Sequence, residues 1–327
     1  MPPPLNHPAQ YQTVPLARIN LQNDNYRITT REDLDDLSVS IQQAGLISPP
    51  ILTKQNSGYT IVSGFRRIAA CQNLGWSEII ACILNPEINH LDCLKLAITA
   101  NSSQRPLNLI ETSRSFQKLS VFTASLKELA AAATFCGLPT NHSVIDKIKN
   151  LCLMPLPIQN CILNETISLT MANELAMHEF DTAIGFARLF EQLKLSLNKQ
   201  KEIVTLSSEI ARREDISICQ VLACDTFQQI IADQDLDRGQ KGQKVRSFLR
   251  QWRFPRLVKV EQTYYAHLKK LKLNPAIKLI PPKEFEGTTY TLNLNFTSLA
   301  HLKMLQKILD KIIEHPSFKE IVENNDD

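Results

Sequence analysis

Two adjacent arginines follow a glycine in the segment Ser63-Gly-Phe-Arg-Arg67. The segment lies where an apolar run typical of a strand gives way to a pattern typical of a helix. At such a turn, free backbone N–H groups and the positive helix end face one point, and glycine permits close approach of a ligand. Guanidinium groups bind phosphate oxygens with paired hydrogen bonds. Gly64, Arg66 and Arg67 therefore indicate a phosphate or carboxylate site; the alternative is an ordinary helix start with solvated arginines.

A compact α/β unit is predicted around this turn. Thr29 and Glu32 have the spacing of a capping box, and the apolar residues that follow predict a helix over about 31–44 that ends at Gly45. The further predicted elements are strands at 51–54 and 59–62 joined as a hairpin, a helix over 64–75, a strand at 78–84 and a helix at 91–100.

The pattern from residue 106 to about 224 is almost wholly helical and predicts an all-α domain. Within it, helices at 126–133 and 143–151 flank a break at 137–139, as in a helix-turn-helix whose second helix enters the major groove of DNA. Val144, Ile148 and Leu151 have the spacing of its packed face. The alternative is an ordinary helical hairpin. The side chains predicted to contact DNA here are Thr140, Asn141, His142, Ser143, Lys147 and Lys149.

An Asp- and Gln-rich linker is predicted over 225–240, followed by a C-terminal module over 241–327 of α-β-β-α order. Its beginning overlaps the stretch 238–259, which holds eight Lys or Arg residues and no acidic residue. Such a stretch fits the phosphate backbone of DNA, and the alternative is a solvated helix face over an apolar stripe. The predicted DNA contacts in it are Arg246, Arg250 and Arg253.

Three segments, in order, resemble the ParB family of partition proteins. The first runs from Leu37 to Ile51 and contains Ser-Ile-Gln-Gln-Ala-Gly-Leu-Ile; the second is Ile61-Val-Ser-Gly-Phe-Arg-Arg-Ile-Ala-Ala70; the third runs from Ala100 to Glu111 and contains Asn-Ser-Ser-Gln-Arg-Pro-Leu-Asn. The resemblance spans about residues 14–215. It implies an α+β multidomain protein with a ParB/sulfiredoxin-like nucleotide-pocket domain over 14–105 and a helix-turn-helix domain over 106–224. Residues 1–13 are rich in Pro and polar residues, which predicts a disordered arm before them.

In that family the boxes line a pocket for CTP and magnesium, and nucleotide binding closes a dimer into a clamp on DNA. Carried over by position, the residues implied to bind nucleotide are Gly45, Leu46, Ser48, Gly64, Arg66, Arg67, Asn101, Gln104 and Arg105, and Asn101 would also lie near the metal. Phe65 and Ala100 stand where the family has glutamates. Because magnesium prefers carboxylate oxygens, these departures predict weak metal binding and slow or absent CTP hydrolysis.

Composition limits the number of domains and the compartment that are compatible with these predictions. The chain has 327 residues, of which 43% are hydrophobic, so two or three domains are expected. Its eight cysteines lack a C-x-x-C pair and predict buried thiols, and no leader or membrane span is recognisable, which predicts a cytoplasmic, nucleoid-associated protein. A net charge of +3 is too small to indicate DNA by itself.

The leading hypothesis is a partition protein that acts as a homodimer on double-stranded DNA, gated by CTP and able to work with a ParA-like ATPase. A locus-specific transcription regulator with a vestigial pocket is the first alternative. The second is an enzyme on the sulfiredoxin, kinase or nuclease-like fold, although Gly64 and Phe65 stand where sulfiredoxin chemistry needs a reactive cysteine.

Overall fold

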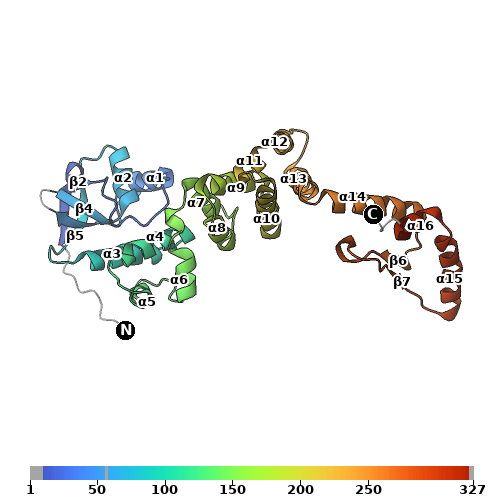
Figure 1. Cartoon of the computed structure of the whole chain (residues 1–327). Helices are drawn as coiled ribbons and strands as arrows, with labels where there is room; N and C mark the ends of the chain where they lie inside the picture. The colour runs from blue at the N-terminus through green and yellow to red at the C-terminus, as the bar shows by residue number, and fades with distance from the viewer. Residues whose placement is uncertain (1–9, 56–57, 324–327) are drawn as a thin grey trace. The chain divides into compact units, whose positions relative to one another are not determined.

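The structure is a computed structural model that describes residues 10–55 and 58–323 of the chain. It divides into two compact units between Leu197 and Asn198 (Figure 1). The first unit holds a mixed α/β part and the first set of helices, and the second holds further helices and a small C-terminal module. The chain is therefore an α+β multidomain protein.

A five-stranded sheet forms the base of the first unit, in the order β1-β5-β3-β4-β2. Strands β3 and β4 make the predicted antiparallel hairpin, while β5 runs parallel to β3 and antiparallel to β1. The side chains of β4 are buried from Tyr59 to Ser63, which makes it the most fully buried strand of the sheet. The bounds of these elements are β1 (Gln10–Pro15), η1 (Leu16–Arg18), β2 (Ile19–Asn20), β3 (Ile51–Gln55), β4 (Gly58–Ser63) and β5 (Glu78–Leu84).

Three helices pack with this sheet: α1 (Asp35–Ala44), α2 (Phe65–Asn73) and α3 (His90–Ser102). Helix α2 contributes Ile68, Ala70 and Cys71 to the core, and α3 packs against β4. The predicted hairpin, the helix after Gly64 and the strand at 78–84 are confirmed by these bounds. The order strand, glycine, helix then places Arg66 and Arg67 on the first turn of α2.

Two local predictions in this part are wrong. Helix α1 begins at Asp35, and Thr29 and Thr30 lie in an extended segment instead of a capping box. The reason is tertiary: the backbone N–H of Thr30 donates to the carboxylate of Glu111, 81 residues away, at 3.0 Å. Residues 10–13, predicted to be disordered, pair with β5 along β1; the rest of the predicted arm, residues 1–9, lies outside the described residues.

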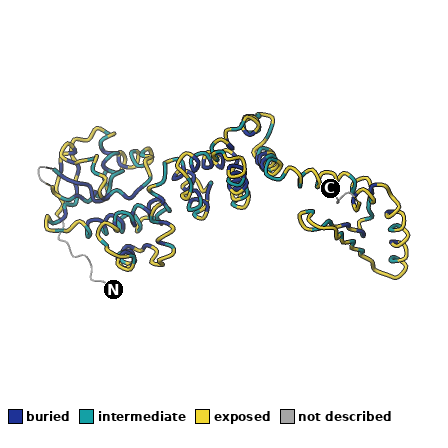
Figure 2. The backbone as a smooth tube through the Cα atoms, viewed as in Figure 1, coloured by how far each residue is buried: buried dark blue, intermediate teal, exposed yellow. Residues whose placement is uncertain are grey.

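The helical part of the first unit has two helices at the positions predicted for the helix-turn-helix. Helix α5 is followed by a break at Gly137 and then by α6, as expected. Ile145, Ile148 and Leu151 form the buried face of the second helix, so the assignment of Val144 to that face is wrong by one position. The bounds are α4 (Leu109–Ser120), α5 (Leu126–Phe135), α6 (His142–Ile148), η2 (Leu151–Leu153), α7 (Leu156–Leu163), α8 (Leu169–Leu175) and α9 (Phe180–Leu193). Figure 2 shows the alternation of buried and exposed residues along these helices.

The second unit begins with α10 (Leu197–Glu214), α11 (Ile218–Ala223), α12 (Asp225–Ala232) and α13 (Arg238–Arg253). Much of the segment predicted as a linker is therefore helix α12, because Phe227 is buried and gives it an apolar face. The C-terminal module follows with α14 (Pro255–Leu271), β6 (Ile277–Ile280), η3 (Lys283–Phe285), β7 (Thr291–Leu294), α15 (Leu299–Ile313) and α16 (Pro316–Glu323). Over the described ranges, none of the helices has the length and apolar character that crossing a bilayer requires.

Candidate functional site

Gly64 makes the sharp turn between β4 and α2. Its φ of 102° is a left-handed conformation, and a Cβ there would lie 2.7 Å from the Cβ of Pro50. A side chain at this position would therefore clash with the segment that precedes β3. The turn leaves the first N–H groups of α2 without helical partners, next to the two arginines.

The two arginines are held by backbone carbonyls. Arg67 Nη1 donates to the carbonyl and hydroxyl of Ser48, the latter at 2.8 Å, and to the carbonyl of Pro49 at 3.3 Å. Arg66 donates through Nε, at 3.0 Å, and Nη2 to the carbonyl of Asp33. Burial lowers the pKa of Arg67, but an arginine remains charged. Carbonyl acceptors orient these guanidinium groups without neutralising them.

The turn opens into a pocket of about 520 Å³, within the range of small-molecule sites. Seven of the nine residues predicted to bind nucleotide line it: Ser48, Gly64, Arg66, Arg67, Asn101, Gln104 and Arg105. Gly45 and Leu46 do not; Gly45 ends α1, and Leu46 packs against the core of the sheet. The pocket also includes Thr29 and Arg31, which sequence reasoning missed because their segment was assigned to a helix start.

The charge of the pocket is strongly positive. Arg31, Arg66, Arg67 and Arg105 line it, and its described lining contains no carboxylate. Arg105 is paired with Glu111, but within the described part of the chain no carboxylate pairs with the other three arginines. The arrangement suits an anionic ligand.

The same lining is a poor magnesium site. Phe65 and Ala100 line the pocket where glutamates were expected from the family pattern, and Asn101 offers one amide group whose nitrogen donates to the carbonyl of Ala97 at 2.7 Å. Magnesium needs hard oxygen ligands, usually carboxylates together with phosphates. The residues present fit the phosphates of a nucleotide and do not fit a protein-bound magnesium ion.

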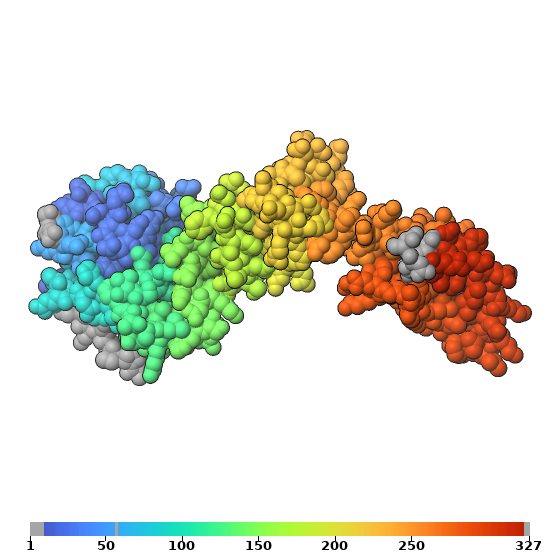
Figure 3. Space-filling model, in the orientation of Figure 1, coloured from blue at the N-terminus to red at the C-terminus, as the bar shows by residue number. Residues whose placement is uncertain are grey.

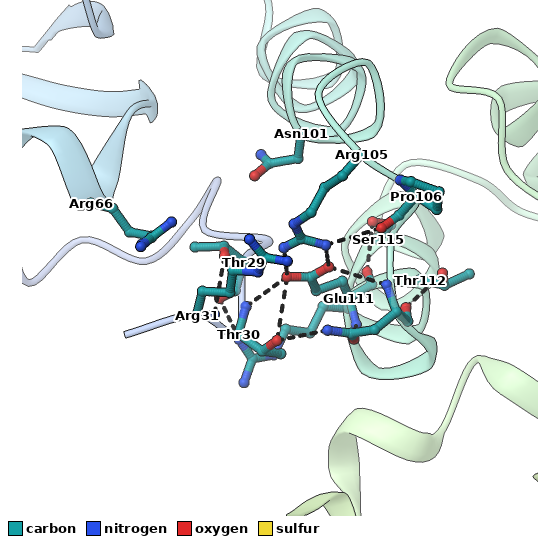
Figure 4. A network of polar contacts seen from close by, with 12 residues as sticks. Thr29, Thr30, Arg31, Arg66, Asn101, Arg105, Pro106, Glu111, Thr112 and Ser115 are labelled. Carbon is teal, nitrogen blue, oxygen red and sulfur yellow. Dashed lines mark hydrogen bonds and ion pairs between the residues drawn. The ribbon is translucent and has the colours of Figure 1, made fainter. Parts of the chain in front are cut away.

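Glu111 ties the pocket wall to helix α4, as Figure 4 shows. Its side chain is fully buried and accepts from Arg105 Nη1 at 2.7 Å and Nη2 at 2.6 Å. It also accepts from the backbone N–H groups of Thr30 and Asn108. Burial alone would raise the pKa of Glu111, but the hydrogen bonds from Arg105, Thr30 and Asn108 outweigh it and hold the pKa below its usual range.

Helix α4 continues from the pocket to the second helix of the helix-turn-helix. At its first turns Arg114 donates to the carbonyl of Thr29 at 2.9 Å. Ser113 and Gln117 of the same helix donate to the carbonyl of Lys149, at 3.0 and 2.9 Å, just beyond the end of α6. The space-filling view shows the green atoms of this helical part in contact with the blue and cyan α/β part (Figure 3). A single helix therefore contacts both candidate functional surfaces.

The predicted DNA contacts gather at the N-terminal end and exposed side of α6. Thr140, Asn141, His142, Ser143 and Lys147 are exposed. Asn141 is the N-cap, and its side chain accepts from the backbone N–H of Val144 at 3.2 Å. Lys149 is half-buried and pairs with Asp146 at 2.7 Å, which reduces its charge at a DNA surface.

The three arginines predicted to contact DNA in the second unit are all paired with glutamates. Arg246 contacts Glu202 at 2.6 Å and Arg253 contacts Glu209 at 2.8 Å, both on α10. Arg250 contacts Glu261 on α14 at 2.6 Å. The stretch that holds these arginines has no acidic residue of its own, so its partners come from elements distant in sequence. These pairs lower the positive charge that the three arginines offer to DNA, and they also differ from the solvated helix face that was the alternative.

An α/β domain with a cationic, nucleotide-sized pocket is followed in this chain by an all-helical part. Residues 5–102 match the ParB N-terminal domain family. The nucleoid occlusion protein of Bacillus cereus (strain AH187) is 25% identical over 225 residues, which cover 62% of this chain and 75% of that relative. That of Geobacillus sp. (strain WCH70) is 30% identical over 142 residues, 43% of this chain and 48% of the relative.

The chain also aligns with solved structures. The C-terminally truncated chromosome-partitioning protein ParB from Caulobacter crescentus complexed with CTP-gamma-S aligns with 24% identity and a TM-score of 0.27, covering 55% of this chain and 98% of that chain. A Pnob8-like ParB-N domain aligns with 13% identity and a TM-score of 0.41, covering 75% and 98%. Residues 5–102 therefore belong to the ParB N-terminal domain family, and the chain is similar to proteins of the ParB family.

Proposed function

We propose that this ParB-like chain binds double-stranded DNA through α6 and a cytidine nucleotide in the arginine-lined pocket, and that it acts in chromosome or plasmid segregation. The observation that carries the proposal is the pocket, where three arginines without a carboxylate partner in the described part of the chain face one cavity. Relatives that align with 62% of the chain are named nucleoid occlusion proteins, which supports a role in binding chromosomal DNA.

The nucleotide enters with its phosphates at the Gly64 turn. Arg66 and Arg67 are already oriented by carbonyl groups, so binding a phosphate costs little ordering of their side chains. The choice of cytosine rests on the family resemblance of the motifs. Because the pocket lacks carboxylates, the nucleotide acts as a bound effector and is hydrolysed slowly if at all.

Helix α4 supplies the route by which nucleotide binding affects DNA binding. A ligand that attracts Arg105 or moves Thr29 acts on Glu111 and Arg114, which lie on α4. The same helix holds the end of α6 through Ser113 and Gln117. Coupling of this kind is reciprocal, so DNA should change the affinity for nucleotide by the same factor.

The C-terminal module is proposed to hold two copies together. Phe296, Leu299 and Met304 are large apolar side chains at or near the start of α15 that are exposed by 53, 69 and 47% in the single chain. Apolar side chains gathered in this way favour a protein interface. Sedimentation of the full chain tests the proposal, because a dimer that Leu299→Lys dissociates is the expected result.

The function is tested by selecting duplexes from a random library with the full chain and measuring their affinity with and without CTP. We expect a selected duplex to bind on the order of a thousandfold more tightly than unselected DNA, and CTP to change that affinity. Specific binding that ignores CTP would favour the transcription regulator with a vestigial pocket. Failure to select any sequence would contradict the DNA-reading role of α6.

A further inference from the structure

A second pocket, of about 300 Å³, lies within the C-terminal module between α14, η3 and α16. Its walls combine aromatic and charged side chains, and it shares no residue with the arginine-lined pocket of the first unit. The size is at the lower end of the range for small-molecule sites and suits one planar ring with a small attached group.

One wall of this pocket is a fixed aromatic cluster. Tyr264 is buried, and its hydroxyl donates to the carbonyl of Leu279 at 2.9 Å, which fixes the ring. The ring of Phe285 lies edge-on to it, with centroids 5.3 Å apart, and that of Tyr290 lies nearly parallel at 6.4 Å. Rings held in this way offer faces on which a ligand ring can stack.

The other wall is a cationic stripe along α14. Arg256, Lys259, Thr263 and His267 follow each other at helical spacing and all line the pocket. Arg256 and Lys259 have no carboxylate partner within the described part of the chain, whereas the lining Glu320 already has a partner. The stripe therefore keeps an excess of positive charge at the pocket.

His267 supplies a separate indication of a ligand. Its Nδ1 atom is buried and has no hydrogen-bond partner among the described residues. A buried polar atom without a partner is unfavourable, and most such atoms in native proteins are satisfied by a neighbour, water or a ligand. The His267 side chain lines the pocket, so a ring bound there can supply the missing hydrogen bond once the imidazole turns toward it.

We propose that this pocket binds an unpaired nucleotide, with its base stacked in the aromatic cluster, its phosphate at Arg256 and Lys259, and a polar edge of the base at His267. Aromatic faces beside cations are the combination by which proteins bind single-stranded nucleic acid. A duplex keeps its bases stacked inside, so the pocket selects a free nucleotide or an exposed base of a single DNA strand. These two sources share the same chemistry.

The test uses the full chain and a short oligothymidylate carrying one 5-iodouracil, which crosslinks on irradiation to aromatic side chains in contact with the base. We expect the crosslinked peptide to contain Phe285 or Tyr290. Thymidine monophosphate as competitor distinguishes the sources: it displaces the oligonucleotide if the pocket takes free nucleotides and fails to do so if it needs a strand. The Arg67→Ala variant should crosslink equally well, which separates this site from the pocket of the first unit.

Affinity measurements complete the test. Phe285→Ala should weaken binding of the oligonucleotide about tenfold, the loss expected for one stacked base. Lys259→Gln should reduce the slope of log affinity against log salt by about 0.7, whereas Lys269→Gln, an exposed lysine on the same helix outside the pocket, should leave it unchanged. Because Lys259 is exposed, Lys259→Gln should leave the core intact. This variant therefore still tests the pocket if Phe285→Ala unfolds the module. Crosslinks confined to other segments, or equal slopes for the two lysine variants, would overturn the proposal.

Discussion

The arginines of the first-unit pocket and those of helix α13 differ in their partners. Arg66 and Arg67 donate to neutral backbone carbonyls, while Arg246, Arg250 and Arg253 each contact a glutamate. In the sequence, the stretch 238–259, which holds α13 and the start of α14, looks the more basic of the two, because eight cations occur there without an acidic neighbour. In the folded chain, the pocket keeps its positive charge and α13 loses much of it to α10 and α14.

Charge along the sequence is therefore a weak guide to charge on a surface. A carbonyl partner orients a guanidinium group and leaves its charge available to a ligand, whereas a carboxylate partner neutralises it. The comparison predicts that pocket arginines govern ligand binding and that α13 arginines contribute modestly to stability. Substitutions at Glu111, Asn141, Ala100 and the three α13 arginines test this difference.

The largest effect is expected at Glu111. Its carboxylate pairs with Arg105, whereas the other pocket arginines have no carboxylate partner among the described residues. Glu111→Gln removes a fully buried carboxylate and leaves Arg105 unpaired, which should lower the free energy of unfolding by about 3 kcal/mol. Chemical denaturation measures the loss. Glu128→Gln is the matched control, since Glu128 holds the same position in α5 but is exposed, and it should cost less than about 0.5 kcal/mol.

Glu111 also predicts an acid dependence. Its pKa in the folded chain lies below the value of about 4.3 expected when unfolded, so its contribution to stability is complete above that value and is lost as the pH falls through the folded pKa. The stability of the wild type should therefore fall more steeply below about pH 4.3 than that of Glu111→Gln. Parallel curves for the two proteins would contradict the role of this carboxylate.

Asn141 tests whether α6, and not α13, reads DNA. Asn141→Ser keeps a good helix cap but removes the amide, so stability should change little while affinity for the selected duplex falls by about 1–3 kcal/mol. Binding to unselected DNA should stay the same. An equal loss on both kinds of DNA would show that Asn141 contacts the backbone or only supports the helix.

A substitution at Ala100 tests whether magnesium binds weakly because the described lining of the pocket has no carboxylate. Ala100→Glu places a hard oxygen ligand beside Asn101, so magnesium should bind CTP-loaded protein about tenfold more tightly than in the wild type. Phosphate release by the wild type should stay below about 1 per second even with DNA present. Turnover above that rate would mean that another carboxylate reaches the nucleotide. Ala100→Gln serves as the uncharged control.

The smallest effect is expected for the α13 arginines. Replacing Arg246, Arg250 and Arg253 by glutamine removes three partly exposed ion pairs, each worth up to about 1 kcal/mol, and should lower stability slightly. The slope of log DNA affinity against log salt should not change. A decrease of about 0.9 for each lost phosphate contact would instead support the original sequence-based expectation that these arginines bind DNA.

The sequence predicted the fold of the first unit and most of its candidate site, because both depend on local patterns. The Gly64 strand-to-helix turn and the segment at the end of the helix near Ala100 contribute most of the seven predicted residues that line one cavity. What it missed depends on contacts between distant segments. Thr30 is held by Glu111, so Arg31 points to the pocket region instead of a helix start, and the glutamates that pair with α13 lie on other helices.

Uncompensated arginine charge in the first-unit pocket is proposed to bind a cytidine nucleotide. Calorimetric titration of the full chain with CTP and with cytidine tests it most directly. We expect CTP to bind, cytidine to bind far more weakly because it lacks phosphates, and Arg67→Ala to abolish CTP binding without unfolding the protein. Arg188→Ala, which removes an exposed arginine on α9, should bind CTP as the wild type does. Absence of CTP binding by the wild type, or unchanged binding by Arg67→Ala, would contradict the claim.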